Sequence, residues 1–171
     1  SPAGGIHGAP LACLFGHGDQ RLLGFGLDGR QLSPAHTVVL GPRSYEAEEV
    51  EFLARIGVRV IGADEIDRCG FQTCLQEALS IVATAPAGFG VTLDLDAFDP
   101  RLAPGVGSPE PDGLAVREVL RGLRALAAQP GLLAMEIVEY NPDRDSGGTT
   151  AALITDLIET ILPSATRGHR S

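Results

Sequence analysis

The stretch that decides the fold of this chain is Val91-Thr-Leu-Asp-Leu-Asp-Ala-Phe-Asp-Pro100, an apolar run that ends in acidic residues. Side chains alternate faces along an extended strand, so we expect Asp94 and Asp96 to project from the same face of a buried strand. Two carboxylates held together in an apolar setting favour a bound cation, and their oxygen atoms suit a hard ion such as Mn²⁺ or Mg²⁺. The alternative is a pair of surface acids at a junction between strand and loop.

The next segment, Asp99 to Leu114, is too rich in proline and glycine for a helix or a strand. Loops of this kind bring backbone groups close to a ligand at the mouth of a strand. The combined string, D-L-D-A-F-D-P-x-x-A-P-G-V-G-S-P-E-P-D-G-L, closely resembles the signature of the ureohydrolase family. That family contains arginases, agmatinases and formimidoylglutamases.

Three further segments resemble motifs of the same family, in the same order along the chain. They are S-P-A-G-G-I-H-G-A-P-L-A (residues 1–12), V-V-L-G-P-R-S-Y-E (38–46) and M-E-I-V-E-Y-N-P (135–142). The resemblance therefore runs from residue 1 to about residue 160. The H-G-x-P-L-A and E-Y-N-P versions of the motifs are the most similar to arginases.

Two metal-ligand motifs of the family, G-G-D-H and D-A-H-x-D, do not occur in this sequence. The sequence opens at Ser1, inside a family motif, and Met135 is its one methionine. We therefore expect the carboxy-terminal part of a longer polypeptide. Residues 1–162 would belong to a single ureohydrolase domain and residues 163–171 would form a flexible tail.

The composition, 44% hydrophobic and 20% charged, is that of a soluble globular protein. The net charge of −9, without a lysine- or arginine-rich stretch, argues against nucleic acid and membrane surfaces as partners. Cys13, Cys69 and Cys74 follow no zinc-site spacing, and we expect them to pack as small apolar residues. These features indicate a cytoplasmic protein.

Hydrophobic periodicity predicts strands that alternate with helices of ten to fifteen residues. This order is typical of an α/β fold with three layers, α-β-α, around a mainly parallel sheet covered on both faces. The resemblance implies the arginase-like version of that fold, here as an incomplete domain. Ligands bind beyond the carboxyl ends of such strands, where Asp94, Asp96 and Glu139 are expected. Strands are predicted over residues 37–40, 58–61, 90–96 and 132–140, and helices over 7–15, 46–56, 71–83, 116–127 and 149–162.

The resemblance also implies roles for individual residues. Asp94 and Asp96 would bind metal, and His7 would deliver a proton to the departing amine. Glu139 would receive the substrate guanidinium in a bidentate contact, and Glu46 would help to hold the α-amino group. The plainer alternatives are a locally hydrogen-bonded histidine at position 7 and an ordinary helix-start acid at position 46.

Glu136 and Ala3 also bear on these role assignments. Alternation puts Glu139 on the strand face of Ile137 and puts Glu136 on the opposite face, where we expect an ion pair with Arg43. Ala3 stands where arginases carry a serine that contacts the substrate α-carboxylate. This difference weakens the prediction that arginine is the substrate, but it does not affect the prediction that the substrate carries a guanidino group.

By resemblance, the parent protein hydrolyses a guanidino compound with a hydroxide that bridges two Mn²⁺ ions. Arginine, giving ornithine and urea, is the first choice of substrate. Agmatine, a guanidino acid and formimidoylglutamate remain open. The only partners implied are this small cationic substrate and further copies of the chain in a trimer or hexamer. A hypothesis of another class is a non-catalytic fragment or subunit, and we expect the 171-residue chain alone to be inactive.

Overall fold

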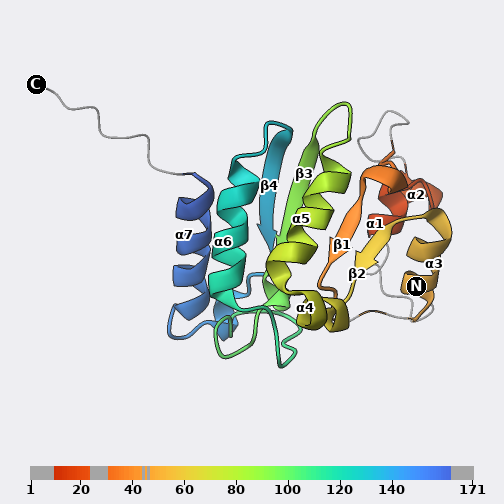
Figure 1. Cartoon of the computed structure of the whole chain (residues 1–171). Coiled ribbons are helices and arrows are strands. Elements are labelled where there is room, and N and C mark those ends of the chain that lie inside the picture. The colour runs from red at the N-terminus through yellow and green to blue at the C-terminus, as the bar shows by residue number, and fades with distance from the viewer. Residues whose placement is uncertain (1–9, 24–30, 44, 46, 163–171) are drawn as a thin grey trace, which may run out of the picture.

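The strands of the protein form two parallel pairs in a computed structural model that describes residues 10–23, 31–43, 45 and 47–162. Strand β1 (Val38–Leu40) pairs with β2 (Arg59–Ile61), and β3 (Phe89–Asp94) pairs with β4 (Leu132–Val138) (Figure 1). The parallel direction confirms the prediction from alternating strands and helices. All four predicted strands are present, but β3 and β4 each end two residues earlier than predicted.

Most predicted helices agree with the structure to within about a residue, but two helices were missed, the four-residue α2 and the longer α4. Helix α4 has only one buried residue, Ile66, among four charged ones, so it lacks the apolar period by which helices are recognised. No helix in the described residues is long and apolar enough to cross a membrane. The helices are α1 (Pro10–Leu14), α2 (Gln20–Leu23), α3 (Ala47–Ile56), α4 (Ala63–Cys69), α5 (Phe71–Val82), α6 (Val116–Ala127) and α7 (Thr149–Ile161), with 3₁₀ turns at Pro34–His36, Leu95–Ala97 and Pro142–Arg144.

The larger core lies between the β3–β4 pair and helices α5, α6 and α7. Val91 and Leu93 of β3 stand opposite Met135 and Ile137 of β4, and all four pack against this core. Helices α5 and α6 approach closely at Gly122, where an added Cβ would lie 2.5 Å from Leu75 Cδ2. The buried members of the core are Leu79, Phe89, Leu95, Phe98, Ala103, Val106, Val119, Leu123, Leu126, Leu153 and Leu157.

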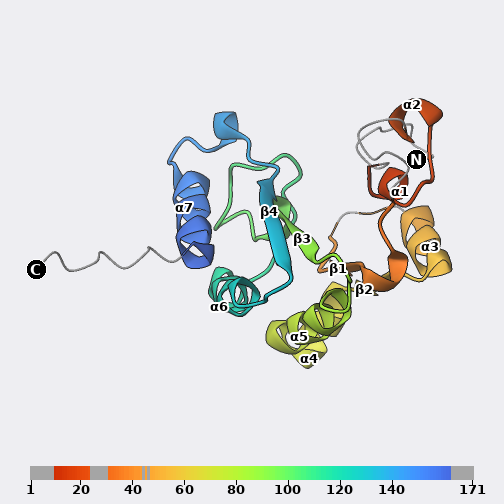
Figure 2. The same cartoon turned by 90° about the horizontal axis from the view of Figure 1, so that it is seen from above.

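A smaller core joins the β1–β2 pair to helices α4 and α5, with Ile61, Ile66, Cys74 and Ala78 buried. Helix α3 lies on the other face of this pair, so helices cover both faces of β1–β2 (Figure 2). Cys74 is 2% exposed, which confirms its predicted packing role. The same prediction is wrong for Cys69, because α4 ends there and its side chain is exposed.

The face of the β3–β4 pair that points away from α6 carries small and polar residues. Gly90, Thr92, Ala134 and Glu136 are all exposed within the described part of the chain. Thr92 Oγ1 donates a 2.7 Å hydrogen bond to Glu136 Oε1 across the two strands. The predicted covering of both sheet faces by helices is therefore present at β1–β2. In the described residues, one face of β3–β4 is open.

Candidate functional site

The three acids predicted to form the site lie at one edge of the β3–β4 pair. Asp94 is the last residue of β3, and Asp96 lies in the 3₁₀ turn that follows it. Glu139 comes directly after β4. Because the two strands are parallel, their carboxyl ends meet at the same edge, and the three acids follow or end the strands there.

The reason given above for the proximity of Asp94 and Asp96 was wrong. Strand β3 stops at Asp94, so alternation of faces does not extend to Asp96. A hydrogen bond holds the pair together instead: the Asp96 amide donates to Asp94 Oδ1 over 2.8 Å, and Asp94 thereby caps the turn. Leu95, fully buried between them, anchors the turn in the core.

Asp96 is held from a second direction by the proline- and glycine-rich loop. The Ser108 amide donates to both carboxylate oxygens of Asp96, at 3.3 Å and 3.2 Å. The loop therefore brings a backbone group to the mouth of the strand, as its composition predicted. A backbone N–H that points at a carboxylate fixes the orientation of that carboxylate without adding charge to the site.

Glu139 has a left-handed backbone conformation, with φ = 67°, which is uncommon for a residue other than glycine. It does not belong to the strand face of Ile137, contrary to the prediction, because β4 ends at Val138. An isolated antiparallel bridge between Val106 and Tyr140 fixes this corner on its far side. Such a conformation persists only where surrounding contacts determine it, and it is a feature found at binding sites.

The acids influence one another electrostatically. Burial by the surrounding protein raises the pKa of the Asp94 carboxyl, although the side chain is exposed at the strand end. The hydrogen bond from the Asp96 amide opposes this rise, while the negative charges of Asp96 and Glu139 add to it. Within the described residues, the ion pairs include none of the three acids. A nearby cation would stabilise the ionised form of Asp94 against this repulsion.

The donor atoms fit a hard divalent ion, but only in part. Carboxylate oxygens are the ligands that Mn²⁺ and Mg²⁺ prefer. No group of three or more His, Cys, Asp or Glu side chains is arranged to hold a metal in the described ranges. Asp94 and Asp96 therefore supply part of a coordination shell, and further ligands would have to come from elsewhere.

Several predictions about other residues can be compared with the structure. His7 and Glu46 lie outside the described residues, as do Ser1 to Ala9. The predicted ion pair between Glu136 and Arg43 is wrong. Glu136 accepts a hydrogen bond from Thr92, whereas Arg43 donates to the backbone carbonyls of Pro111 and Asp112.

Asp99, which was not among the predicted site residues, is a buried acid that connects the two ends of the loop. Its carboxylate makes a bidentate contact with Arg101, at 2.8 Å and 2.9 Å, and also accepts the Asp112 amide at 3.2 Å. The Arg101 guanidinium holds the pKa of Asp99 well below its usual range. Asp99 thereby joins residues 99 and 112, the two ends of the loop that delivers Ser108.

A second buried acid, Asp145, fixes the start of α7 beside the same loop. It accepts the Thr150 amide at 3.0 Å, the Ala151 amide at 2.9 Å and the Tyr140 hydroxyl at 3.2 Å. Thr150, fully buried, accepts the Gly105 amide at 2.8 Å through its hydroxyl. Asp145 lies three residues before Gly148, the N-cap of α7, so the usual signal of an acid at the N-cap position does not reveal this role.

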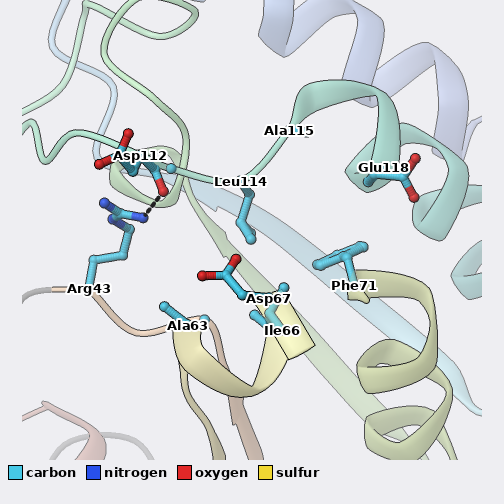
Figure 3. A pocket seen from close by; sticks show the side chains of 11 residues that line it. Arg43, Ala63, Ile66, Asp67, Phe71, Asp112, Leu114, Ala115 and Glu118 are labelled. Carbon is cyan, nitrogen blue, oxygen red and sulfur yellow. Dashed lines mark hydrogen bonds between the residues drawn. The ribbon is translucent and has the colours of Figure 1, made fainter. Parts of the chain in front are cut away.

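An open pocket of about 340 Å³ lies beyond this loop, between α4 and the start of α6 (Figure 3). Its floor is apolar, formed by Ile66, Phe71 and Leu114, while Arg43 and Asp112 meet at its rim. None of the three site acids lines it. We therefore place the candidate site at the acids and not in this pocket.

Comparison with known proteins identifies the family. The Arginase family matches residues 1–163. The chain belongs to the Arginase family. It is 37% identical over 161 residues to an arginase of Brevibacillus brevis, which covers 94% of this chain and 54% of that protein. The chain thus spans about half the length of the curated relatives that it matches.

Solved structures confirm the arginase-like fold. The native arginase structure from Bacillus caldovelox superposes with a TM-score of 0.88 at 34% identity, covering 94% of this chain and 54% of that one. The proclavaminate amidino hydrolase from Streptomyces clavuligerus gives 0.68 at 32% identity, covering 79% and 44%. The three-layer α/β class is therefore correct, and the coverage agrees with an incomplete domain.

Proposed function

We propose that this chain supplies one half of a manganese-dependent arginase, which hydrolyses arginine to ornithine and urea. The observation that carries the proposal is the placement of Asp94, Asp96 and Glu139 at the carboxyl edge of β3–β4, in a chain of the Arginase family. Three acids without a cationic partner among the described residues suit both a divalent metal and a cationic guanidinium.

Asp94 and Asp96 would hold the metal. Two bound Mn²⁺ ions would lower the pKa of a shared water and supply hydroxide at neutral pH. The chain orients its two ligands by backbone contacts, from the Asp96 amide to Asp94 and from the Ser108 amide to Asp96. The fixed orientation reduces the entropy lost when a metal binds.

Glu139 would receive the substrate guanidinium, because carboxylate and guanidinium match in a bidentate, charge-assisted contact. Hydrolysis breaks the bond between the guanidino carbon and the nitrogen of the side chain, so the departing amine must gain a proton. His7, which lies outside the described residues, would deliver that proton, since imidazole titrates near neutrality. Glu46, also outside them, would help to hold the α-amino group.

The substrate choice rests on the relatives. Relatives that are 37%, 35% and 33% identical to this chain are named arginases, which favours arginine. Ala3 lacks the hydroxyl that the arginase pattern provides for the α-carboxylate, and an amidino hydrolase is among the similar structures. Agmatine, guanidino acids and formimidoylglutamate therefore belong in any substrate screen.

A second candidate function is a non-catalytic subunit. It is favoured by one specific observation: in the described residues, no three His, Cys, Asp or Glu side chains are placed so that together they could hold a metal ion. The chain also spans only about half of its relatives. The metal content per chain, measured by elemental analysis after incubation with Mn²⁺ and the missing arginase portion, separates the two candidates when it is read together with urea release.

The decisive experiment measures urea release by the purified 171-residue chain with Mn²⁺ and arginine. We expect little or no urea from the chain alone, because two carboxylates without further ligands bind metal weakly. Addition of the portion of an arginase relative that this chain does not cover should produce activity. The Asp156→Asn variant is a matched control for charge, because Asp156 is an exposed acid on α7, outside the site.

Three outcomes are informative. Urea release only in the mixture supports the proposal, and light scattering of the active species then tests for a trimer or hexamer. Substantial urea release from the chain alone means that a complete site exists within it, and our account of the metal ligands is wrong. Metal bound in the mixture without any hydrolysis favours the non-catalytic subunit.

A further inference from the structure

One arginine contacts the loop next to the site and lies outside the family motifs described above. Arg144, at the end of the 3₁₀ turn Pro142–Arg144, donates from Nη1 to the carbonyl oxygens of Gly107 and Val106. The distances are 2.8 Å and 3.2 Å. Arg144 thus contacts the loop just before Ser108, whose amide reaches Asp96.

The Gly107 carbonyl and the Ser108 amide belong to one peptide unit. A peptide unit is planar, and in the trans form its C=O and N–H point in opposite directions. The structure contains no cis peptide bond among the described residues. The Arg144 guanidinium therefore lies on one side of this peptide, and the Asp96 carboxylate lies on the other.

We propose that Arg144 is a positioning residue for Asp96, acting through the peptide between Gly107 and Ser108. The guanidinium holds the carbonyl, which fixes the direction of the amide on the opposite side. It also polarises the peptide, because a hydrogen bond to the carbonyl strengthens the N–H as a donor. The proposal rests on the proposed function to the extent that Asp96 is a metal ligand.

The same turn lies beside the second acid of the site. An added Cβ on Gly107 would lie 3.4 Å from Glu139 Oε2, so the backbone of Gly107 closely approaches that carboxylate. A shift of the turn would therefore change the surroundings of Asp96 and Glu139 together. We expect Arg144 to influence both metal affinity and guanidinium binding.

The rest of the loop has tethers that do not involve Arg144. The Asn141 amide donates to the Gly105 carbonyl at 2.8 Å, and the Gly105 amide donates to the buried Thr150 hydroxyl at 2.8 Å. Replacement of Arg144 should therefore leave the fold intact and affect the turn at Val106 and Gly107, which includes the Gly107–Ser108 peptide.

The charge of Arg144 is available for this role. Its side chain is exposed, and the ion pairs of the described residues do not include it. Arg101, by contrast, is paired with Asp99. Arg144 is therefore directed at backbone carbonyls and not at a carboxylate.

The first test uses NMR of the 171-residue chain without metal. In Arg144→Gln, the Ser108 amide should shift upfield and exchange about 3- to 10-fold faster, the size expected for a weakened hydrogen bond. Asp96→Asn should shift the same amide. The control Arg124→Gln removes the same charge from an exposed position on α6 and should leave Ser108 unchanged.

The second test measures Mn²⁺ affinity by calorimetry in the chain supplemented with the missing arginase portion. Arg144→Gln should weaken binding by about 10-fold, the lower end for residues that orient metal ligands. Arg144→Lys keeps a donor for the carbonyls and should recover part of the affinity. If Arg144 has only a structural role, Arg144→Lys should not recover Mn²⁺ affinity, and both substitutions should lower the melting temperature.

An unchanged Ser108 resonance in both Arg144→Gln and Arg144→Lys overturns the proposal, as does unchanged Mn²⁺ affinity. If Arg144→Gln does not fold, Arg144→Lys is compared with the wild-type chain instead, and its Ser108 amide should show a smaller shift in the same direction. Failure of the wild-type mixture to bind Mn²⁺ would overturn the proposed function, whereas the Ser108 shift would still test the contact between Arg144 and Asp96.

Discussion

The Asp96 amide donates a 2.8 Å hydrogen bond to Asp94 Oδ1, so the second acid of the D-x-D pair orients the first. The bond forms because the chain leaves the extended conformation after Asp94 and turns into a 3₁₀ segment anchored by buried Leu95. The two carboxylates are therefore arranged by a turn and not by the pleat of a strand. Substitution of one acid should consequently disturb the other.

Asp96→Asn should reduce manganese occupancy by at least about 10-fold in the chain supplemented with the missing arginase portion. A neutral amide replaces a charged oxygen ligand, and the amide nitrogen cannot coordinate a metal. Elemental analysis after gel filtration measures the occupancy. The control Asp156→Asn should retain the metal, and full manganese in Asp96→Asn would remove Asp96 from the ligand set.

Glu139→Gln should keep manganese but lose about 10- to 100-fold in kcat/KM for a guanidino substrate, because a charged hydrogen bond contributes about 1.5–3 kcal/mol. Steady-state urea release at saturating Mn²⁺ measures the loss. Glu136→Gln is the matched control, since Glu136 bonds to Thr92 on the open strand face. Equal activity of the two variants would show that Glu139 does not contact the guanidinium.

The sequence allowed prediction of most elements because their apolar positions repeat with a clear period, as in α6 and β3. It did not allow prediction of α4, which has a single buried residue. The proximity of Asp94, Asp96 and Glu139 was predictable from parallel strands, but the turn at Asp96 and the positive φ of Glu139 were not. Both depend on the loop 99–114 and its packing, which leaves no local period in the sequence.

Arg144 illustrates why the remaining part of the site was missed. Its partners are backbone carbonyls 37 and 38 residues away, at Gly107 and Val106. Every residue type has a backbone carbonyl, so such a contact has no signature in side-chain identity. The ion pair predicted for Arg43 failed for the same reason, since Arg43 also donates to carbonyls.

Manganese affinity should decrease with falling pH, starting at a higher pH than for an ordinary aspartate pair. Burial and the nearby charges of Asp96 and Glu139 raise the pKa of Asp94, and a ligand must lose its proton to bind metal. Protons therefore compete with the metal as the pH falls toward the raised pKa. Calorimetry across a pH series measures the affinity. In Glu139→Gln the decrease should begin at a lower pH, because one of the raising charges is absent.

Gly113→Ala should destabilise the folded chain by about 1–3 kcal/mol, the usual cost of inserting a methyl group into a packed position. An added Cβ at Gly113 would lie 2.2 Å from the Phe98 carbonyl carbon and 2.2 Å from the Asp99 amide nitrogen, both backbone atoms that cannot rotate away. The loop would have to move away from Phe98, which would also lengthen the contact between Asp99 and the Asp112 amide.

Urea denaturation followed by circular dichroism measures the free energy of unfolding. The control Gly147→Ala adds a methyl group whose nearest neighbour, Thr149 Oγ1, lies at an ordinary contact distance of 3.6 Å, and it should change stability by no more than about 0.5 kcal/mol. Equal stability of the two variants would mean that the loop can retreat from β3 without loss, and that its close packing does not fix the position of Ser108.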